Sequence, residues 1–554
     1  MSNSIRSFDR SSIRYLCTAV LIAILATSSL SASSTGDTGG GATGGEDVLA
    51  DPMAAVGLAW IDWAIIGAYA LSTVGFGWYF GRQQTSTQEY FVGSGNMNWL
   101  LIGVSLFATL LSTISYLSIP GEILGKGPVY LTILLALPIV YVIVAYGLLP
   151  LYMRHRVTSA YELLEAQLGL SVRLLGAVMF LVMRLVWMSL LVYLAAKAMT
   201  VMLGVEPRYI PIIVLVTGFV SVIYTSLGGL KAVVITDLVQ TILLFGGALL
   251  VIAMITYDTG GLGWFPTEWQ PNWDTQPIFS FDPQTRITVV GTIVSVVIWY
   301  VCTAGGDQVS VQRFMATRDL QAARRSLATQ LVVSMVVHIT LVIVGLALLG
   351  YFQAHQGDLP ANMSIGGNAD DLFPHFISFH LPIGVSGLVV AAMFAAAMSS
   401  IDSGVNSITA VVMTDFLDRF GLRPETEKRQ VLAARLLALA IGAIVVVGSA
   451  YMEHIPGNIT AVTNKTVNLL TPSLFALFFF ALFVPFSTSL GVWIGWICGI
   501  VTAILTAFSG PIFGVDPVTG YDPISFQWIG LSTLVVNLTI GTVVSWLSYR
   551  GTIA

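Results

Sequence analysis

Long apolar stretches separated by short polar segments account for most of the chain. Each is long enough to cross a bilayer, and lipid requires such a segment to be helical because its backbone must bond internally. Gly228-Gly229 predicts a tight turn between two neighbouring stretches. The pattern predicts about thirteen transmembrane helices. The predicted spans are 54–80, 98–119, 128–153, 174–204, 209–227, 232–257, 287–306, 327–352, 382–413, 431–452, 459–485, 488–509 and 526–548.

The composition agrees with an all-α polytopic membrane protein. Of the 554 residues, 56% are hydrophobic and 10% are charged, whereas soluble domains carry about 25% charged residues. The formal net charge of −5 is spread thinly, so we expect no nucleic-acid partner. The three cysteines, Cys17, Cys302 and Cys498, follow neither a metal-ligand spacing nor a disulfide framework.

The N-terminal residues 1–33 have the layout of a secretory signal peptide. Arg6, Arg10 and Arg14 precede an apolar run, and small residues follow at 31–33. A retained helix is the alternative. Residues 34–53 are rich in Gly, Thr and Ser and predict a flexible linker. The segment 54–97 is expected to be an accessory first helix with its loop.

The loop charges predict an N-terminus outside the cytoplasm and a cytoplasmic C-terminus. Positive residues gather on cytoplasmic loops, and this orientation gives fifteen inner against four outer Lys and Arg residues. The longer outer loops, 257–286 and 353–382, are expected to be caps with short interfacial helices. The four outer residues are Lys126, Arg208, Arg286 and Lys465.

The stretch Ala395–Ser407 places a carboxylate inside an apolar span. Helical spacing puts Ser399, Asp402, Ser403 and Asn406 on one face. A charge at this depth costs roughly 2.5–3.5 kcal/mol on insertion scales, so it indicates function. Small residues alone would indicate close helix packing, but with Asp402 on the same face we favour a cation site.

Hydroxyl residues interrupt the span 98–119, at Ser105, Thr109, Ser112, Thr113 and Ser115. One interpretation is a packed helix whose hydroxyls bond its own carbonyls. The other is an unwound helix whose freed carbonyls hold Na⁺. Pro120-Gly121 is expected to break this helix near its far end.

Further polar residues lie at membrane depth. Asp237 is either an interfacial cap or salt-bridge partner of Lys231, or part of a second cation site facing Asp402. Arg184 is expected to need a partner inside the bundle, and His338, alone in mid-span, favours a structural role. Gly305-Gly306 interrupts another span, after which polar residues form an expected inner mouth. These are Asp307, a candidate helix cap, with Gln308, Gln312 and Arg313.

Several motifs together resemble the sodium:solute symporter family, whose members share the leucine-transporter type of fold. The resemblance extends from about Asp62 to about Pro485, and the order and spacing of the motifs carry it. The motifs are Gly228–Ala232 with Thr236-Asp237, Gly306–Ala316, Ala396–Ser407 and the lead-in Phe91–Trp99.

The resemblance implies an inverted repeat, here 98–257 and 287–485, followed by accessory helices over 486–554. It implies a main sodium site at the carbonyls of Ala108, Leu111 and Ala396 and the hydroxyls of Ser399 and Ser400. A second ion site, known in some members, would fall on Asp237, Asp402 and Ser403. Asp402 departs from the serine expected there, which leaves the second ion's identity open.

The solute is less well defined. The gate position of the sugar carriers corresponds here to Thr303, and Leu134 and Leu137 stand where polar residues are expected, which weakens a glucose or galactose assignment. Pro120–Glu122 with Gly127 resembles the branch that carries monocarboxylates, vitamins or iodide. The expected solute is small and polar, an organic anion or a sugar. Its expected path is Thr109, Ser112, Ser115, Trp299, Tyr300 and Thr303.

The predicted function is Na⁺-coupled symport of this solute by alternating access, without enzymatic activity. Na⁺ is the expected coupling ion, the cell membrane the expected location, and no obligate protein partner is inferred. A proton-coupled symporter of the same fold is one alternative. A membrane-embedded hydrolase that uses Asp237 and Asp402 as an acid pair is another.

Overall fold

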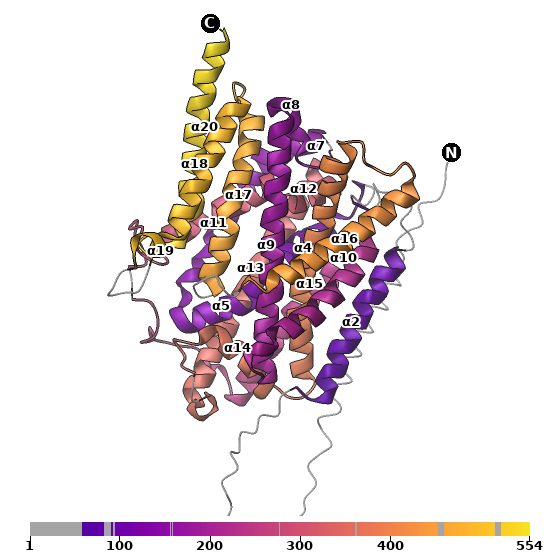
Figure 1. Ribbon diagram of the computed structural model, residues 1–554. Coiled ribbons are helices and arrows are strands. Elements are labelled where there is room, and N and C mark those ends of the chain that lie inside the picture. The colour runs from indigo at the N-terminus through magenta and orange to yellow at the C-terminus, as the bar shows by residue number, and fades with distance from the viewer. Residues whose placement is uncertain are drawn as a thin grey trace, which may run out of the picture. The chain divides into compact units, whose positions relative to one another are not determined.

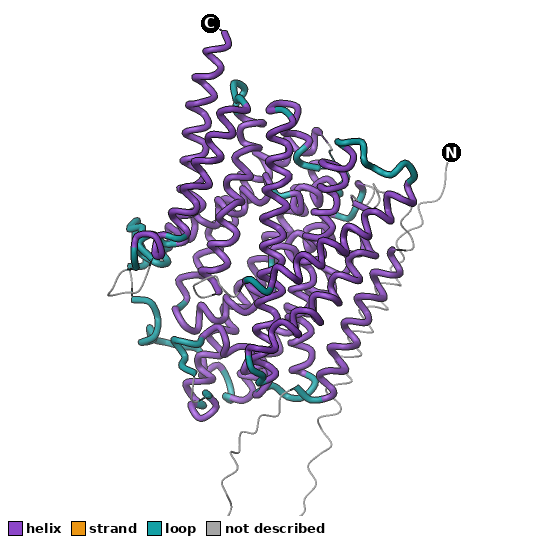
Figure 2. Tube along the Cα trace, viewed as in Figure 1, coloured by secondary structure: helices purple, strands orange, loops and turns teal. Residues whose placement is uncertain are grey.

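The computed structural model describes residues 58–81, 90–91, 95–155, 157, 159–275, 277–360, 363–452, 459–515 and 522–553. The predicted signal peptide and linker lie outside these residues. Helices make up most of the described chain, and the longest connection between them follows α10 (Ile210–Asp258) and precedes α11 (Val289–Gly306) (Figures 1 and 2).

The helices follow the predicted spans closely. In chain order they are α2 (Trp60–Gly81), α4 (Trp99–Leu110), α5 (Thr113–Lys126), η2 (Pro128–Ala136), α6 (Leu137–Val142), η3 (Ile143–Leu148), α7 (Leu149–His155), α8 (Glu162–Leu168), α9 (Leu170–Leu203), α10 (Ile210–Asp258), α11 (Val289–Gly306), α12 (Gln308–Met315), α13 (Leu320–Ala354), α14 (Ala369–Phe379), α15 (Val385–Val411) with η7 (Val412–Asp418), α16 (Glu427–Ser449), α17 (Ile459–Phe483), α18 (Ser489–Ala507), α19 (Ser509–Phe513) and α20 (Ile529–Ile553).

Length and hydropathy identify ten membrane spans among the described residues, or eleven if a bent pair counts as one. The bent pair is α4 and α5, whose axes differ by 64°. This count is below the thirteen predicted, although a helix lies at each predicted position. The tight turn predicted before Lys231 is confirmed, because Gly229 has φ 59° and ψ −176° within α10. A residue with a Cβ would be strained in that conformation.

The break in the first expected repeat lies mid-span. Leu111 and Ser112 have extended backbone between α4 and α5. The expectation of a break at Pro120-Gly121 was wrong, since both residues lie inside α5. Close packing holds the helix there, because a Cβ on Gly345 of α13 would lie 2.7 Å from the Pro120 carbonyl oxygen. Tertiary contacts thus override the local preference of proline.

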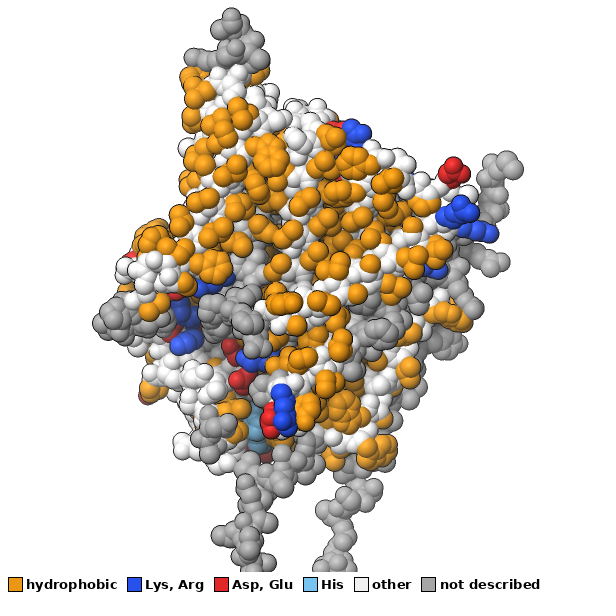
Figure 3. All heavy atoms as spheres, in the orientation of Figure 1, with side chains coloured by type: hydrophobic (Ala, Val, Ile, Leu, Met, Phe, Trp, Pro, Cys, Tyr) orange, Lys and Arg blue, Asp and Glu red, His pale blue; other side chains and the backbone are white. Residues whose placement is uncertain are grey.

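α15 is buried along nearly its whole length. It packs against α10, α2 and α9, and α10 also packs against α2 and α16. Hydrophobic side chains cover most of the face seen in Figure 3, whereas charged side chains are few. Figure 1 shows α8 and α14 at opposite ends of the bundle, called here the α8 end and the α14 end. A buried polar helix inside an apolar exterior is the arrangement expected for a site within the membrane.

Candidate functional site

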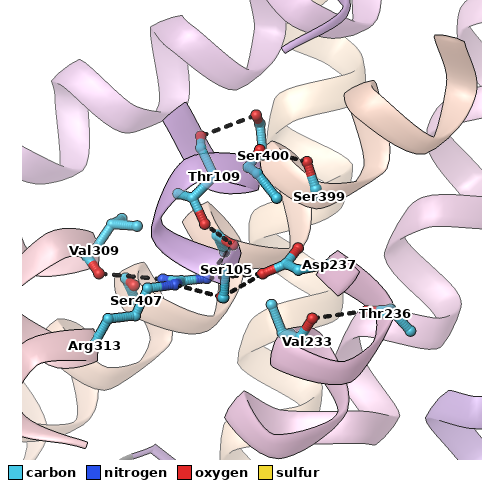
Figure 4. A network of polar contacts seen from close by, with 12 residues as sticks. Ser105, Thr109, Val233, Thr236, Asp237, Val309, Arg313, Ser399, Ser400 and Ser407 are labelled. Carbon is cyan, nitrogen blue, oxygen red and sulfur yellow. Dashed lines mark hydrogen bonds and ion pairs between the residues drawn. The ribbon is translucent and has the colours of Figure 1, made fainter. Parts of the chain in front are cut away.

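Two serines of α15 meet the broken end of α4. The Ser399 hydroxyl donates to the Ala108 carbonyl over 2.7 Å and also lies 3.1 Å from the Ala396 carbonyl. The Ser400 hydroxyl donates to the Thr109 carbonyl over 3.1 Å. All of these residues are buried. The break therefore brings hydroxyl and carbonyl oxygens from two helices to one place (Figure 4).

This set of oxygens fits a small hard cation. Oxygen ligands without thiolate or imidazole suit such ions. The extended backbone at Leu111, with φ −88° and ψ 125°, takes its carbonyl out of the helical direction. The four residues Ala108, Ala396, Ser399 and Ser400 lie together as expected, with the Thr109 carbonyl as an additional oxygen that the sequence did not indicate.

A second polar network centres on Arg313 of α12, which is 0% exposed. Its Nε donates to Ser105 Oγ over 2.8 Å and its Nη2 donates to Ser403 Oγ. Ser105 in turn donates to Asp237 Oδ2 over 2.5 Å, and Arg313 Nη2 lies 3.5 Å from the same carboxylate oxygen. Asp237 therefore pairs with Arg313 and not with Lys231 (Figure 4).

The network joins residues that were expected at two different sites. Asp237 and Ser403 were expected in a second ion site, and Arg313 at an inner mouth. Ser403 also lies 2.8 Å from Thr109 Oγ1, which connects the network to the α4 break. Asp402 is fully buried and precedes Ser403 on α15. A guanidinium thus lies between two of the three residues of the expected second site.

The expected inner-mouth residues lie at the α8 end and are all buried. Asp307 caps α12 through the Val309 amide and forms an ion pair with Arg184 of α9. The predicted helix cap and the predicted partner of Arg184 are therefore one residue. Gln308 accepts from the Ala160 amide, and Gln312 donates to the Phe91 carbonyl. These contacts join the helices to one another at the α8 end.

Cavities lie on the other side of these contacts. One of about 590 Å³ opens at the α14 end, between α5, α9, α14 and α17. A second of about 100 Å³ lies deeper, and Ser115, Trp299 and Tyr300 line it. A third of about 30 Å³ includes Thr109 and Thr303. Of the expected solute path, Ser112 is in none of these linings.

Sequence reasoning missed most of the deeper cavity's polar lining. Gln330, Ser334 and His338 are spaced by four residues on α13 and all face it. This spacing on one helical face was the signal that could have found them. His338, expected to be structural, accordingly borders the cavity.

A family model shows what kind of protein this is. The model of the sodium:solute symporter family matches residues 90–499. The chain belongs to the sodium:solute symporter family. Membership in a family of transporters shows that the alternative of a membrane-embedded hydrolase was wrong.

Individual relatives agree with this assignment. A sodium/sialic acid symporter of Proteus mirabilis (strain HI4320) is 29% identical, over 81% of this chain and 90% of the relative. A sodium-coupled monocarboxylate transporter 1 of Xenopus laevis is 26% identical, over 86% of this chain and 75% of the relative. Among solved structures, the substrate-bound outward-open state of a Na⁺-coupled sialic acid symporter has a TM-score of 0.75 and 25% identity. That match covers 88% of this chain and 98% of the solved one.

Proposed function

We propose that this member of the family couples the inward movement of Na⁺ to that of a small polar solute. The observation that carries the proposal is the meeting of Ser399 and Ser400 with carbonyls at the α4 break. Relatives named as sodium symporters, and the fold shared with a Na⁺-coupled symporter, support Na⁺ as the coupling ion.

The proposed main sodium ligands are the carbonyls of Ala108, Leu111 and Ala396 and the hydroxyls of Ser399 and Ser400. Carbonyl and hydroxyl dipoles stabilise a cation without adding a fixed charge at membrane depth. In this conformation the Ser399 hydroxyl bonds the Ala108 carbonyl. Na⁺ would accept both oxygens as ligands in place of this bond. Because the ligands come from α4 and α15, binding would fix these two helices relative to one another.

We place the α14 end outside the cell and the α8 end in the cytoplasm, with the mature N-terminus outside. The distribution of Lys and Arg over the loops supports this orientation. The repeats are proposed at 98–257 and 287–485. The breaks at Leu111–Ser112 and at Asp307 support this division, because each lies in the first helix of its repeat.

Transport would follow alternating access. The large cavity at the α14 end admits the solute, and the ion pairs at the α8 end keep the inner path closed. Solute in the cavity lined by Leu111 and Ser115 would contact the same broken segment that binds Na⁺. Reciprocal linkage then requires solute to tighten Na⁺ binding by the factor by which Na⁺ tightens solute binding.

The test of the sodium site is uptake into proteoliposomes with Na⁺, K⁺ or choline outside. Ser399→Ala and Ser400→Ala are each expected to raise the Na⁺ concentration for half-maximal uptake by roughly tenfold, equivalent to about 1.4 kcal/mol. Ser386→Ala is the matched control, since Ser386 lies on the same helix and bonds the Leu381 carbonyl. Unchanged Na⁺ dependence in both variants contradicts the site. Uptake that follows a pH gradient with no Na⁺ dependence replaces sodium with protons.

A second coupled ion is proposed at Asp237, Asp402 and Ser403. Support comes from the burial of both carboxylates at membrane depth. The guanidinium of Arg313 is the positive charge beside Asp237 in this conformation. Na⁺ entry would require Arg313 to release Ser403, which it contacts in this structure. The measurement is the charge moved per solute for Asp237→Asn and Asp402→Asn. If neither substitution changes that ratio, the second ion does not exist.

A further inference from the structure

The deeper cavity has a mixed polar and apolar lining that carries no formal charge among its described residues. It contains hydroxyls, amides, one imidazole, two phenols and two indoles. The polar and aromatic lining residues are Phe107, Ser115, Ser118, Tyr130, Trp187, Ser295, Trp299, Tyr300, Gln330, Ser334, His338, Thr460, Thr463 and Asn464. None of the described lining residues is Lys, Arg, Asp or Glu.

Two ion pairs lie at the neighbouring cavities, and the two lysines of the large cavity, Lys126 and Lys197, do not line the deeper one. Arg184 and Asp307 line the small cavity next to it and form an ion pair with each other. Toward the α14 end, Glu122 lines the large cavity and is paired with Arg286. Neither pair leaves a guanidinium for an anionic solute in the deeper cavity without breaking an existing contact.

We propose that the deeper cavity takes an uncharged, hydroxyl-bearing solute, such as a polyol or a neutral sugar. This proposal rests on the proposed symport function and names the class of its solute. Burying a carboxylate without a paired cation costs far more than burying a hydroxyl that finds hydrogen-bond partners. The described lining of this cavity offers an acid no positive charge, so within the cavity the co-transported Na⁺ would be its counter-ion.

The lining offers what a hydroxylated solute needs. Tyr300 Oη and Ser334 Oγ lie 3.1 Å apart, and Ser334 Oγ lies 3.3 Å from His338 Nδ1, so three polar groups form a row along one wall. Gln330, one turn before Ser334, adds a carboxamide that both donates and accepts. Trp299 and Trp187 supply flat apolar surface for the C–H faces of a sugar or polyol. A few polar groups among aromatic walls are typical of small-molecule sites.

The inferred class differs from that of the named relatives. The Proteus mirabilis relative is named for sialic acid and the Xenopus laevis relative for monocarboxylates, both of which are acids. Specificity is a difference between affinities, and an unpaired buried charge is an effective way to reject a competitor. The inference is therefore that this chain keeps the family's ion coupling while its solute is neutral.

The experiment uses the full chain in detergent and in proteoliposomes with matched pairs of solutes. The pairs are mannose and mannuronate, xylitol and xylonate, and glycerol and glycerate. Binding is measured as the shift in thermal unfolding that each solute causes in Na⁺ and in K⁺. Binding of Na⁺ alone is measured in a separate experiment, as the shift that Na⁺ causes without solute. Failure of the sodium site is thereby distinguished from failure of this proposal.

We expect at least one neutral member to bind in Na⁺ and its acid partner to bind about tenfold or more weakly, a difference of about 1.4 kcal/mol. Gln330→Leu is expected to weaken the neutral solute about tenfold while the shift caused by Na⁺ alone is unchanged. Gln321→Leu, at an exposed position of the same helix, is the matched control. Preferential binding of the acids, or binding of no neutral member by a chain that binds Na⁺, overturns the proposal.

Discussion

The two ends of the helix bundle differ in how they are held together. At the α8 end, buried ion pairs join one transmembrane helix to another: Arg184 of α9 to Asp307, and Arg173 of α9 to Asp415. At the α14 end, the buried arginine Arg286 lies in a loop and pairs with Glu122 at the end of α5. A cavity of about 590 Å³ opens beside that pair.

The difference indicates which end is closed in this conformation. Helices tied by desolvated ion pairs must break those pairs to separate, whereas a loop can move without displacing the helices it crosses. In the proposed orientation, the α8 end is therefore the one that would have to rearrange to open a path to the cytoplasm. The α14 end holds the largest of the three cavities described above, and its buried arginine joins a loop to α5 rather than one transmembrane helix to another.

Arg184→Ala tests whether the ion pair with Asp307 holds the α8 end closed, and it is expected to have the largest effect. Removing one partner leaves Asp307 buried without its arginine, which costs about 3–5 kcal/mol. Thermal unfolding is expected at a lower temperature, and Cys302, which is buried in α11 next to Thr303, is expected to react faster with a hydrophilic maleimide. The measurement uses a Cys17→Ser/Cys498→Ser background so that Cys302 is the reporter.

The matched control for this prediction is Arg208→Ala. Arg208 pairs with Glu206, but both side chains are 68% exposed, and such a pair is worth about 0–1 kcal/mol. A double variant, Arg184→Met/Asp307→Asn, removes both charges and retains a cap at 307, and is expected to recover much of the lost stability. Unaltered Cys302 labelling in Arg184→Ala would show that the pair does not hold the α8 end closed.

Asp370→Asn tests the open end and is expected to have an intermediate effect. Burial, with Glu122 and Asp371 nearby, raises the pKa of Asp370 to about 6. The folded state then holds this proton more tightly than the unfolded state between about pH 4 and pH 6. Stability contributed by Asp370 is therefore present at low pH and lost as pH rises through that window.

The quantity compared is the stability of the Asp370→Asn variant minus that of the unsubstituted protein. This difference is expected to increase by about 1–2 kcal/mol from pH 4 to pH 7, because solvent screens part of the effect of the raised pKa. The asparagine side chain retains an oxygen for the Ile459 amide, which Asp370 Oδ2 accepts over 3.1 Å. The measurement is the difference between the two unfolding midpoints at each pH, which cancels the titration of His375 and His380. A difference independent of pH would contradict the raised pKa.

Asp62→Ala is expected to have the smallest effect. Asp62 of α2 accepts from the amides of Gly384 and Gly387 at 2.7 and 2.8 Å, so it caps the start of α15. Losing such a cap typically costs about 1 kcal/mol. We expect a small fall in the unfolding midpoint and unchanged Cys302 labelling, because the cap lies at the α14 end. Faster labelling would remove the distinction drawn between the two ends.

Much of the architecture follows from the sequence. Apolar runs of spanning length identified the helices, since lipid leaves few alternatives to a helix. Helical spacing correctly placed Ser399 and Ser403 on a buried face of α15, and the pair Gly305-Gly306 correctly indicated the end of α11 before Asp307. These features depend on residues close together in the chain, where periodicity and capping apply directly.

The position of the helix break did not follow from local preference. Pro120 was expected to break the helix near its far end, but α5 continues through it. The other expectation, an unwound segment among the hydroxyl residues of 98–119, is confirmed at Leu111–Ser112. Packing of α5 against Gly345 of α13 and against α14 holds the helix across the proline. No local signal reports contacts made by residues so distant in the chain.

The sequence by itself determined a chain of membrane helices with a polar face on α15 and the family to which it belongs. The tertiary structure decided which oxygens meet Ser399 and Ser400, that Arg313 lies between Asp237 and Ser403, and that Gln330 and His338 border one cavity. The reason is physical. Periodicity fixes the direction of a side chain around its own helix, but the partner it meets depends on how separate helices pack.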